Sequence, residues 1–156
     1  MSNQLILSEQ FELLKDDLIK LYDAKGMRSS GKWADSLEVI AGEDTVKLMG
    51  EEYSQQLETG RKAGKFPPIA DIKKWIIDKG VFTSALQNIS LSSLAFLIAR
   101  KIANNGWKRE RFGGVELIST VVTDERIQKI INEVGNAQII QVSSEIIRLI
   151  NELETA

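Results

Sequence analysis

Apolar residues recur every three or four positions in five stretches of the chain, and this spacing predicts amphipathic helices. In the first stretch, Ser8 is a suitable N-cap and Gly26 follows the last periodic position. Pro68 suits the start of another helix, because its missing N–H needs no partner there. The expected helices cover residues 8–24, 68–79, 92–105, 124–134 and 137–153, with Gly135 ending the fourth.

Between residues 35 and 58 the period changes to two, which is typical of strands. The alternation runs from Leu37 to Ala41 and from Val46 to Gly50, on either side of a turn, and predicts a β-hairpin. A third extended piece is expected at 52–58, where the period is ambiguous. The β-branched stretch 115–122 fits a strand or a helix.

Together these elements predict one α+β domain over residues 1–156, with amphipathic helices packed on a small antiparallel β-hairpin. A chain of 156 residues is long enough to bury roughly 70% of its unfolded surface. The apolar positions of the helices give the expected core, which includes Leu14, Leu18, Trp75, Ile98 and Ile102.

The composition removes many kinds of catalytic site, since the chain has no Cys and no His. Ser-His-Asp and Cys-His nucleophiles, zinc fingers and haem ligation by His are excluded. Adjacent acids such as Asp16-Asp17 point apart and do not form an acid–base pair. Residues 60–65 fail as a phosphate-binding loop, because only three residues separate the glycines and Phe66 follows the Lys. We therefore expect no enzyme, no cofactor and no metal site.

Charge is distributed unevenly along the chain, although the net charge is only -2. Residues 1–59 carry 6 basic and 12 acidic residues, residues 60–111 carry 11 and 3, and residues 112–156 carry 3 and 7. A basic centre between acidic ends has three interpretations: internal neutralisation, a nucleic-acid-facing surface, or subunits that meet through complementary charges.

Two tryptophans and a basic loop are the candidate binding residues. Trp33 and Trp107 are expected in polar, basic loops, where they would anchor an interface, stack on single-stranded nucleic acid, or fold back over the core. The loop 60–68 combines glycines, prolines and basic residues with Phe66 as an apolar tip, or as a plug for the end of its own domain. The residues expected to dock a partner are Trp33, Arg61, Lys62, Lys65, Phe66, Trp107, Lys108, Arg109 and Arg111.

Several short segments resemble the neck or tail-completion (head–tail joining) proteins of tailed bacteriophages. After the first helix come Gly26-Met27-Arg28 and Ser36-Leu37, similar to the entry into the family's hairpin. Leu57-Glu58-Thr59-Gly60-Arg61 and the Gly64-Lys65-Phe66-Pro67-Pro68-Ile69 phrase follow, and the second is the most specific match. The stretch from Ser93 to Ile102 is similar to the family's next helix. The resemblance covers about residues 8–111.

The resemblance implies a non-enzymatic structural protein of the virion, assembled in the host cytoplasm. Its partners would be copies of itself in a ring, portal or connector and tail-tube proteins, and possible DNA passing through the lumen. No apolar run approaches the ~20 residues of a membrane span, and residues 1–4 lack the basic start of a secretory signal. The alternative is a DNA-associated module that uses residues 60–111 on phosphates, and a small carboxylate-dependent enzyme ranks last.

Overall fold

Helices make up most of the molecule, and two short strands form its sheet. The computed structural model describes residues 2–43, 45–81, 88–107 and 116–154. The expected α+β class is confirmed. The elements are α1 (Asn3–Ala24), α2 (Lys32–Ser36), β1 (Glu38–Ala41), β2 (Val46–Met49), α3 (Ser54–Thr59), α4 (Ile69–Lys79), α5 (Leu91–Asn105), α6 (Leu117–Val121) and α7 (Asp124–Glu154).

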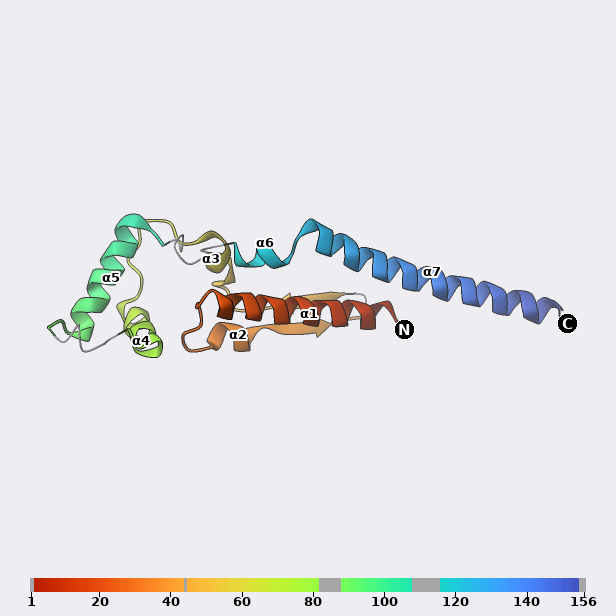
Figure 1. The fold of residues 1–156 in the computed structure, drawn as a ribbon, viewed down its shortest axis with the longest axis horizontal. Coiled ribbons are helices and arrows are strands. Elements are labelled where there is room, and N and C mark those ends of the chain that lie inside the picture. Colours follow the sequence, from red (N-terminus) through yellow and green to blue (C-terminus); the bar gives the residue numbers. More distant parts are fainter. Residues whose placement is uncertain (1, 44, 82–87, 108–115, 155–156) are drawn as a thin grey trace.

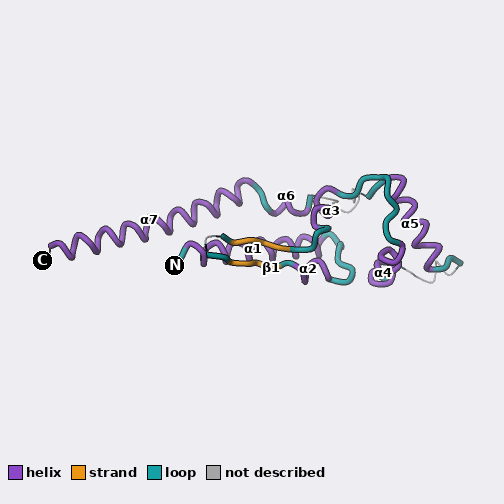
Figure 2. The backbone as a smooth tube through the Cα atoms, turned by 180° about the vertical axis from the view of Figure 1, so that it is seen from behind, coloured by secondary structure: helices purple, strands orange, loops and turns teal. Residues whose placement is uncertain are grey.

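The molecule is elongated, with α1 at the centre of its main body (Figure 1). Helix α1 contacts both strands of the hairpin, α6 and the first half of α7. Helices α4 and α5 pack on each other at one end, and the C-terminal part of α7 projects from the other end (Figure 2). We call the described residues between Arg61 and Trp107, which include α4 and α5, the lobe, and the rest of the described chain the body.

Helix α1 begins five residues earlier than the sequence predicted. Ser2 is its N-cap, with a side-chain oxygen that accepts a hydrogen bond from the Leu5 N–H at 3.3 Å. Ser8, the predicted cap, therefore lies inside the helix. The extra turn brings Leu7 against the core, and this packing stabilises helical structure beyond the local signal.

The predicted hairpin is confirmed, and the segments beside it are helical. Strands β1 and β2 pair antiparallel, with Val39 opposite Leu48 and Ala41 opposite Val46. The expected third extended piece at 52–58 is wrong, because Ser54–Thr59 form α3. The stretch around Trp33, expected to be a loop, forms α2. Both helices are short, and tertiary contacts outweigh weak local preferences in such segments.

The main core lies between α1, α2, α6 and the start of α7. Leu14 and Leu18 are buried as predicted, next to Leu117 and Ile130. Helix α6 is held in place by α3, because the Glu58 carboxylate accepts hydrogen bonds from the first N–H groups of α6, including that of Ile118 at 2.6 Å. A carboxylate suits the positive end of a helix.

Trp75 was predicted to be a core residue, and this is wrong, since 40% of it is exposed. Its neighbour Ile76 is fully buried instead, and α5 buries Ala95, Ala99 and Ala103. Small residues at this four-residue spacing let α4 approach α5 closely. Ile98 and Ile102, also predicted to be buried, lie on another side of α5 and are half-buried.

The C-terminal part of the chain is one 31-residue helix, α7, and not the two helices that were predicted. Thr123 caps its N-terminus as expected, accepting a hydrogen bond from the Arg126 N–H at 3.2 Å. Gly135 does not end the helix, because the periodic apolar residues continue beyond it and a single Gly weakens a helix by only about 1 kcal/mol. Residues 117–121 are helical, which decides the open assignment for the described part of 115–122.

Replacing Gly135 by alanine should raise the free energy of unfolding by about 0.8–1 kcal/mol, because alanine loses less backbone entropy on forming a helix. Nothing lies within 4 Å of the position that the added Cβ would take. The exposed neighbour Asn136→Ala is the control and should give a smaller gain. Urea unfolding measures both, and a loss of stability in Gly135→Ala would contradict a continuous helix.

Helices α1 and α7 run antiparallel, and polar contacts fix their register. The Arg126 guanidinium lies 2.7 Å from the Asp17 carboxylate, and the Gln10 side chain donates to Glu133 at 2.6 Å. The two contacts are seven residues apart on both helices. Continued at the same spacing, this register brings the N-terminus of α1 opposite residue 140, so the rest of α7 extends beyond α1 (Figure 1).

The hydrogen bond from Arg126 lowers the pKa of Asp17 below its ordinary value of 3.8. Its stabilising contribution is therefore complete at neutral pH and is lost as the pH falls through the lowered pKa. Because Asp17 is partly exposed, Arg126→Gln should destabilise by only about 0.5–1 kcal/mol at pH 7. Urea unfolding at several pH values should show this difference shrinking below pH 4; a constant difference would contradict the ion pair. Lys20→Gln, which removes a longer contact to Asp17 of 3.5 Å, should have a smaller effect.

Candidate docking surfaces

The predicted docking loop, residues 60–68, has a backbone that is fixed by hydrogen bonds to the end of α5. Arg61 and Trp107 exchange two backbone hydrogen bonds, of 2.9 and 2.7 Å, and the Gly64 N–H donates to the Ala103 carbonyl at 2.7 Å. The loop therefore lies across the end of α5 in a defined conformation.

Gly106 makes this close contact possible. Its φ is +70°, in the region that favours glycine, and a Cβ at this position would come within 2.3 Å of the Arg61 carbonyl oxygen. The backbones of the loop and of the chain after α5 thus meet where no larger residue fits.

The fixed loop presents exposed basic and aromatic side chains. Lys62 and Lys65 are exposed, and Arg61 is half-buried, with its guanidinium donating to the Lys65 carbonyl at 3.3 Å. Phe66 contacts Phe96 at a ring-centroid distance of 5.6 Å, yet the two rings are 48% and 46% exposed. Phe66 therefore packs on its own lobe without being covered by it.

The other predicted docking residues have different surroundings. Trp33 is only 2% exposed, stacks on Tyr22 at 4.6 Å and donates to the Ser54 hydroxyl at 2.9 Å. It is a core residue, and its prediction as a docking residue is wrong, because its polar neighbours in sequence did not indicate its burial. Trp107 is half-buried beside Arg61. Lys108, Arg109 and Arg111 lie outside the described residues.

A groove of about 690 Å³ separates the lobe from the body. One side comes from α4, α5 and the start of the segment after α5, and the other from the ends of α1–α3. Lys79 of α4 bridges the two sides, because its ammonium donates to the carbonyls of Gly26 and of Arg28, the second at 2.9 Å. The apolar residues that line the groove include Tyr53, Leu57, Trp75, Ile98, Ile102 and Trp107.

Charge in the groove has one sign among its described lining residues. Arg61, Lys79 and Lys101 contribute positive charge, and no carboxylate lines the groove there. Partial burial, and secondarily the nearby Glu51, raises the pKa of the Tyr53 phenol above its ordinary value. The groove thus offers an apolar floor and a basic rim. Sequence reasoning missed it because its residues come from segments far apart in the chain, although the basic stretch 60–111 and the polar surroundings of Trp107 were partial signals.

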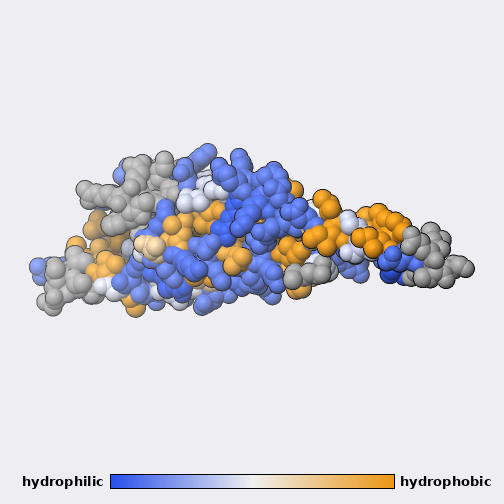
Figure 3. All heavy atoms as spheres, turned by 45° about the vertical axis from the view of Figure 1, so that its right-hand side comes forward, coloured by the Kyte–Doolittle hydropathy of each residue, from blue (hydrophilic) through white to orange (hydrophobic). Residues whose placement is uncertain are grey.

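The projecting half of α7, residues 138–154, carries the largest set of exposed aliphatic side chains in the described chain. Ile139, Val142, Ile146 and Leu149 follow one another at spacings of three and four, and they are 47–64% exposed. Ile140, Ile147 and Ile150 widen this apolar surface. Figure 3 shows hydrophobic residues gathered at that end of the molecule. Such a surface on a helix marks contact with another chain or helix.

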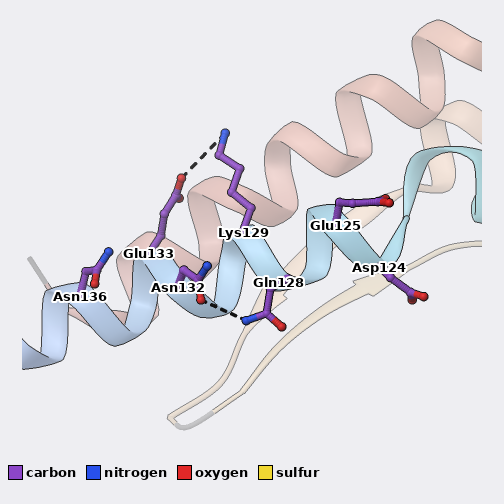
Figure 4. A pocket seen from close by; sticks show the side chains of 7 residues that line it. All are labelled: Asp124, Glu125, Gln128, Lys129, Asn132, Glu133 and Asn136. Atoms are coloured by element: carbon purple, nitrogen blue, oxygen red, sulfur yellow. Dashed lines mark hydrogen bonds and ion pairs between the residues drawn. The ribbon is translucent and has the colours of Figure 1, made fainter.

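The first half of α7 has a polar hollow instead (Figure 4). Asp124 and Glu125 point in different directions, and Glu133 pairs with Lys129 at 3.9 Å. Gln128 donates to Asn132 at 3.0 Å. These side chains pair along the helix surface and do not converge on a reacting atom. Within the described ranges, no group of three or more Asp or Glu residues is arranged to hold a metal ion.

No protein-family model, curated protein or solved structure matches the chain. None of the helices in the described ranges combines the length and hydrophobicity needed to cross a membrane.

Proposed function

We propose that the chain is a structural subunit of a tailed-bacteriophage virion, a neck or tail-completion component that forms a ring and joins the head connector to the tail. The segment with the most specific resemblance to that family runs from Gly64 to Ile69, and all of it except Ile69, the first residue of α4, belongs to the loop that is fixed on α5.

The observation that carries the proposal is a rigid loop with exposed side chains. Three backbone hydrogen bonds hold the loop, while Lys62, Lys65 and Phe66 are free of cover by the described residues. A backbone that is already ordered loses little entropy when a partner docks. Two cations beside an aromatic ring then supply orientation and apolar contact area, which suits a protein–protein joint.

The placement of charge along the molecule supports a ring. The described part of the basic segment 60–111 lies at the lobe end, and α7, in the acidic C-terminal segment, reaches toward the opposite end (Figure 1). Subunits with unlike ends associate head to tail, and such contacts close into rings when the rotation between subunits permits.

The test reverses charge on the loop without touching its backbone. Lys62→Glu with Lys65→Glu is preferable to a change at Arg61, whose guanidinium bonds the loop itself. The matched control is Lys47→Glu with Lys74→Glu, two exposed lysines outside the loop. Thermal melting should be unchanged in both proteins. In complementation of head–tail joining, the loop variant should fail and the control should succeed; normal joining by the loop variant would contradict the proposal.

Measuring the binding of the chain to generic duplex DNA distinguishes the head–tail joining role from the alternative, a DNA-associated module. Contacts to Z phosphates give a slope of about -0.9Z in a plot of log affinity against log salt. If the wild-type chain binds duplex DNA with such a slope and the loop variant loses both DNA binding and function, the DNA-associated module replaces the joining role.

A further inference from the structure

We propose that the projecting half of α7 in one copy of the chain occupies the groove between lobe and body of the next copy. This inference rests on the proposed function and specifies the contact that would build the ring.

The projecting half of α7 carries apolar side chains that the described part of its own chain leaves uncovered. The α1–α7 register ends near residue 140, and beyond it Val142, Ile146 and Leu149 are 58%, 51% and 47% exposed. The groove of the same copy cannot receive them, because α4 and α5, which line it, lie at the end of the molecule opposite the C-terminus (Figures 1 and 2). A second copy of the chain offers the same groove to this helix.

A two-stranded coiled coil between α7 helices accounts less well for the apolar pattern. The 3–4 spacing from Ile139 to Leu153 covers only about two heptads, fewer than the three or four that indicate a coiled coil. Ile140 and Ile147 lie outside that spacing and are 67% and 58% exposed. An apolar surface this wide fits a helix that is surrounded on more than one side, as in a groove.

The groove matches the helix in both hydrophobicity and charge. Its floor includes Trp75, Ile98, Ile102 and Trp107, and its basic residues face no carboxylate among the described lining residues. Residues 138–154 contain three glutamates and one arginine. A basic rim therefore meets an acidic helix, while the aliphatic side chains meet an aromatic floor.

The direction of this contact has a distinct consequence. Each copy offers one helix and one groove, so the interface is heterologous and each subunit contacts two neighbours. Two different single-sided defects should therefore complement each other in a mixture.

The experiment uses the full chain with three sets of changes. The helix variant is Ile146→Gln with Leu149→Gln, which keeps helix propensity and removes apolar contact. The groove variant is Trp75→Ala with Lys101→Glu, at two partly or fully exposed positions. Ser144→Gln, at an exposed position of the same helix two residues before Ile146, is the matched control. Circular dichroism and melting confirm that every protein is folded before association is measured.

Analytical sedimentation measures the association state of each protein. The concentration series of ~1–100 µM spans weak to moderate protein affinities. Wild type and Ser144→Gln should form species larger than dimers, and each defective variant should associate at least tenfold more weakly. An equimolar mixture of the two variants should stop at a heterodimer that uses the one intact helix and the one intact groove.

Two results would overturn the inference. The wild-type chain could stay monomeric throughout the series, or the groove variant could associate as well as wild type while the helix variant does not, which would indicate α7–α7 pairing. The proposed function is tested by a separate experiment. Normal head–tail joining by the Lys62→Glu, Lys65→Glu loop variant would contradict that function, whether or not the chain self-associates.

Discussion

Replacing Trp33 by alanine is expected to lower the free energy of unfolding by about 3–5 kcal/mol, the usual loss when a large aromatic side chain is removed from a core. Trp33 is 2% exposed, stacks on Tyr22 and donates its indole N–H to the Ser54 hydroxyl. The same hydroxyl donates to the Glu51 carbonyl. The change would therefore leave a cavity and also remove a hydrogen bond that joins α2 to the start of α3.

Trp75→Ala is the matched control, since it removes the same side chain from a position that is 40% exposed. It should cost about 1 kcal/mol or less, as expected away from the buried core. Denaturant unfolding followed by circular dichroism measures both. Equal losses in the two variants, or a larger loss in Trp75→Ala, would mean that the two tryptophans have been assigned to the wrong environments.

Gly106→Ala should destabilise the protein by about 2–4 kcal/mol, because two effects add at this position. The φ of +70° is unfavourable for alanine, and the added Cβ would come within 2.3 Å of the Arg61 carbonyl oxygen. That oxygen belongs to the backbone, so the loop 60–68 would have to move away from α5. The hydrogen bonds between Arg61 and Trp107 would lengthen or break.

Gly64→Ala separates the two effects. Its φ of +132° is also in the region favoured by glycine, but nothing lies within 4 Å of its missing Cβ. It should show the backbone strain alone, of about 1–3 kcal/mol, and leave the Arg61–Trp107 pair intact. Amide hydrogen exchange at Trp107 distinguishes the variants: protection should fall in Gly106→Ala and persist in Gly64→Ala. If protection at Trp107 is unchanged in Gly106→Ala, the close approach at this position is not required.

The elements with strong periodicity were predictable from the sequence, and so was the hairpin. Helices α4 and α5 begin within one residue of their predicted starts at 68 and 92, because both have a clear apolar periodicity and Pro68 suits a helix start. The alternation around Val39 and Leu48 predicted the two strands, and the structure adds their register. In these segments the local preference and the tertiary structure agree, so local reasoning was sufficient.

The errors arose where tertiary contacts decide the outcome. The ambiguous segment 52–58 becomes helical as part of a network around Trp33 and α6. Gly135 was treated as a stop, although a helix that packs on α1 tolerates one glycine. Trp33 was expected at a docking surface and is buried, whereas Trp75 was expected in the core and is partly exposed. Both predictions failed because the polarity of the neighbours in sequence is a poor indicator of solvent exposure.

The candidate site was predictable only in part. The loop 60–68 and its exposed Lys62, Lys65 and Phe66 were identified from glycine, proline and charge alone. The groove was not, since its walls come from α1, α3, α4 and α5 and form only when the chain is folded. The apolar surface of α7 was read from its periodicity as the side of a helix that faces the core, because periodicity does not indicate whether such a surface is covered.

The backbone pairing of Arg61 with Trp107 gives the lobe the topology of an insertion. Residues 62–106 leave the body and return to it at two points joined by hydrogen bonds of 2.9 and 2.7 Å. A short linker between Arg61 and Trp107 could therefore replace residues 62–106, because the two ends to be joined are already adjacent. The entropy lost on closing such a short linker would be small. The remaining body would keep α1, the hairpin and the α1–α7 contact. In evolutionary terms, a lobe with adjacent ends can be lengthened, exchanged or lost between related chains while the core around Trp33 stays the same.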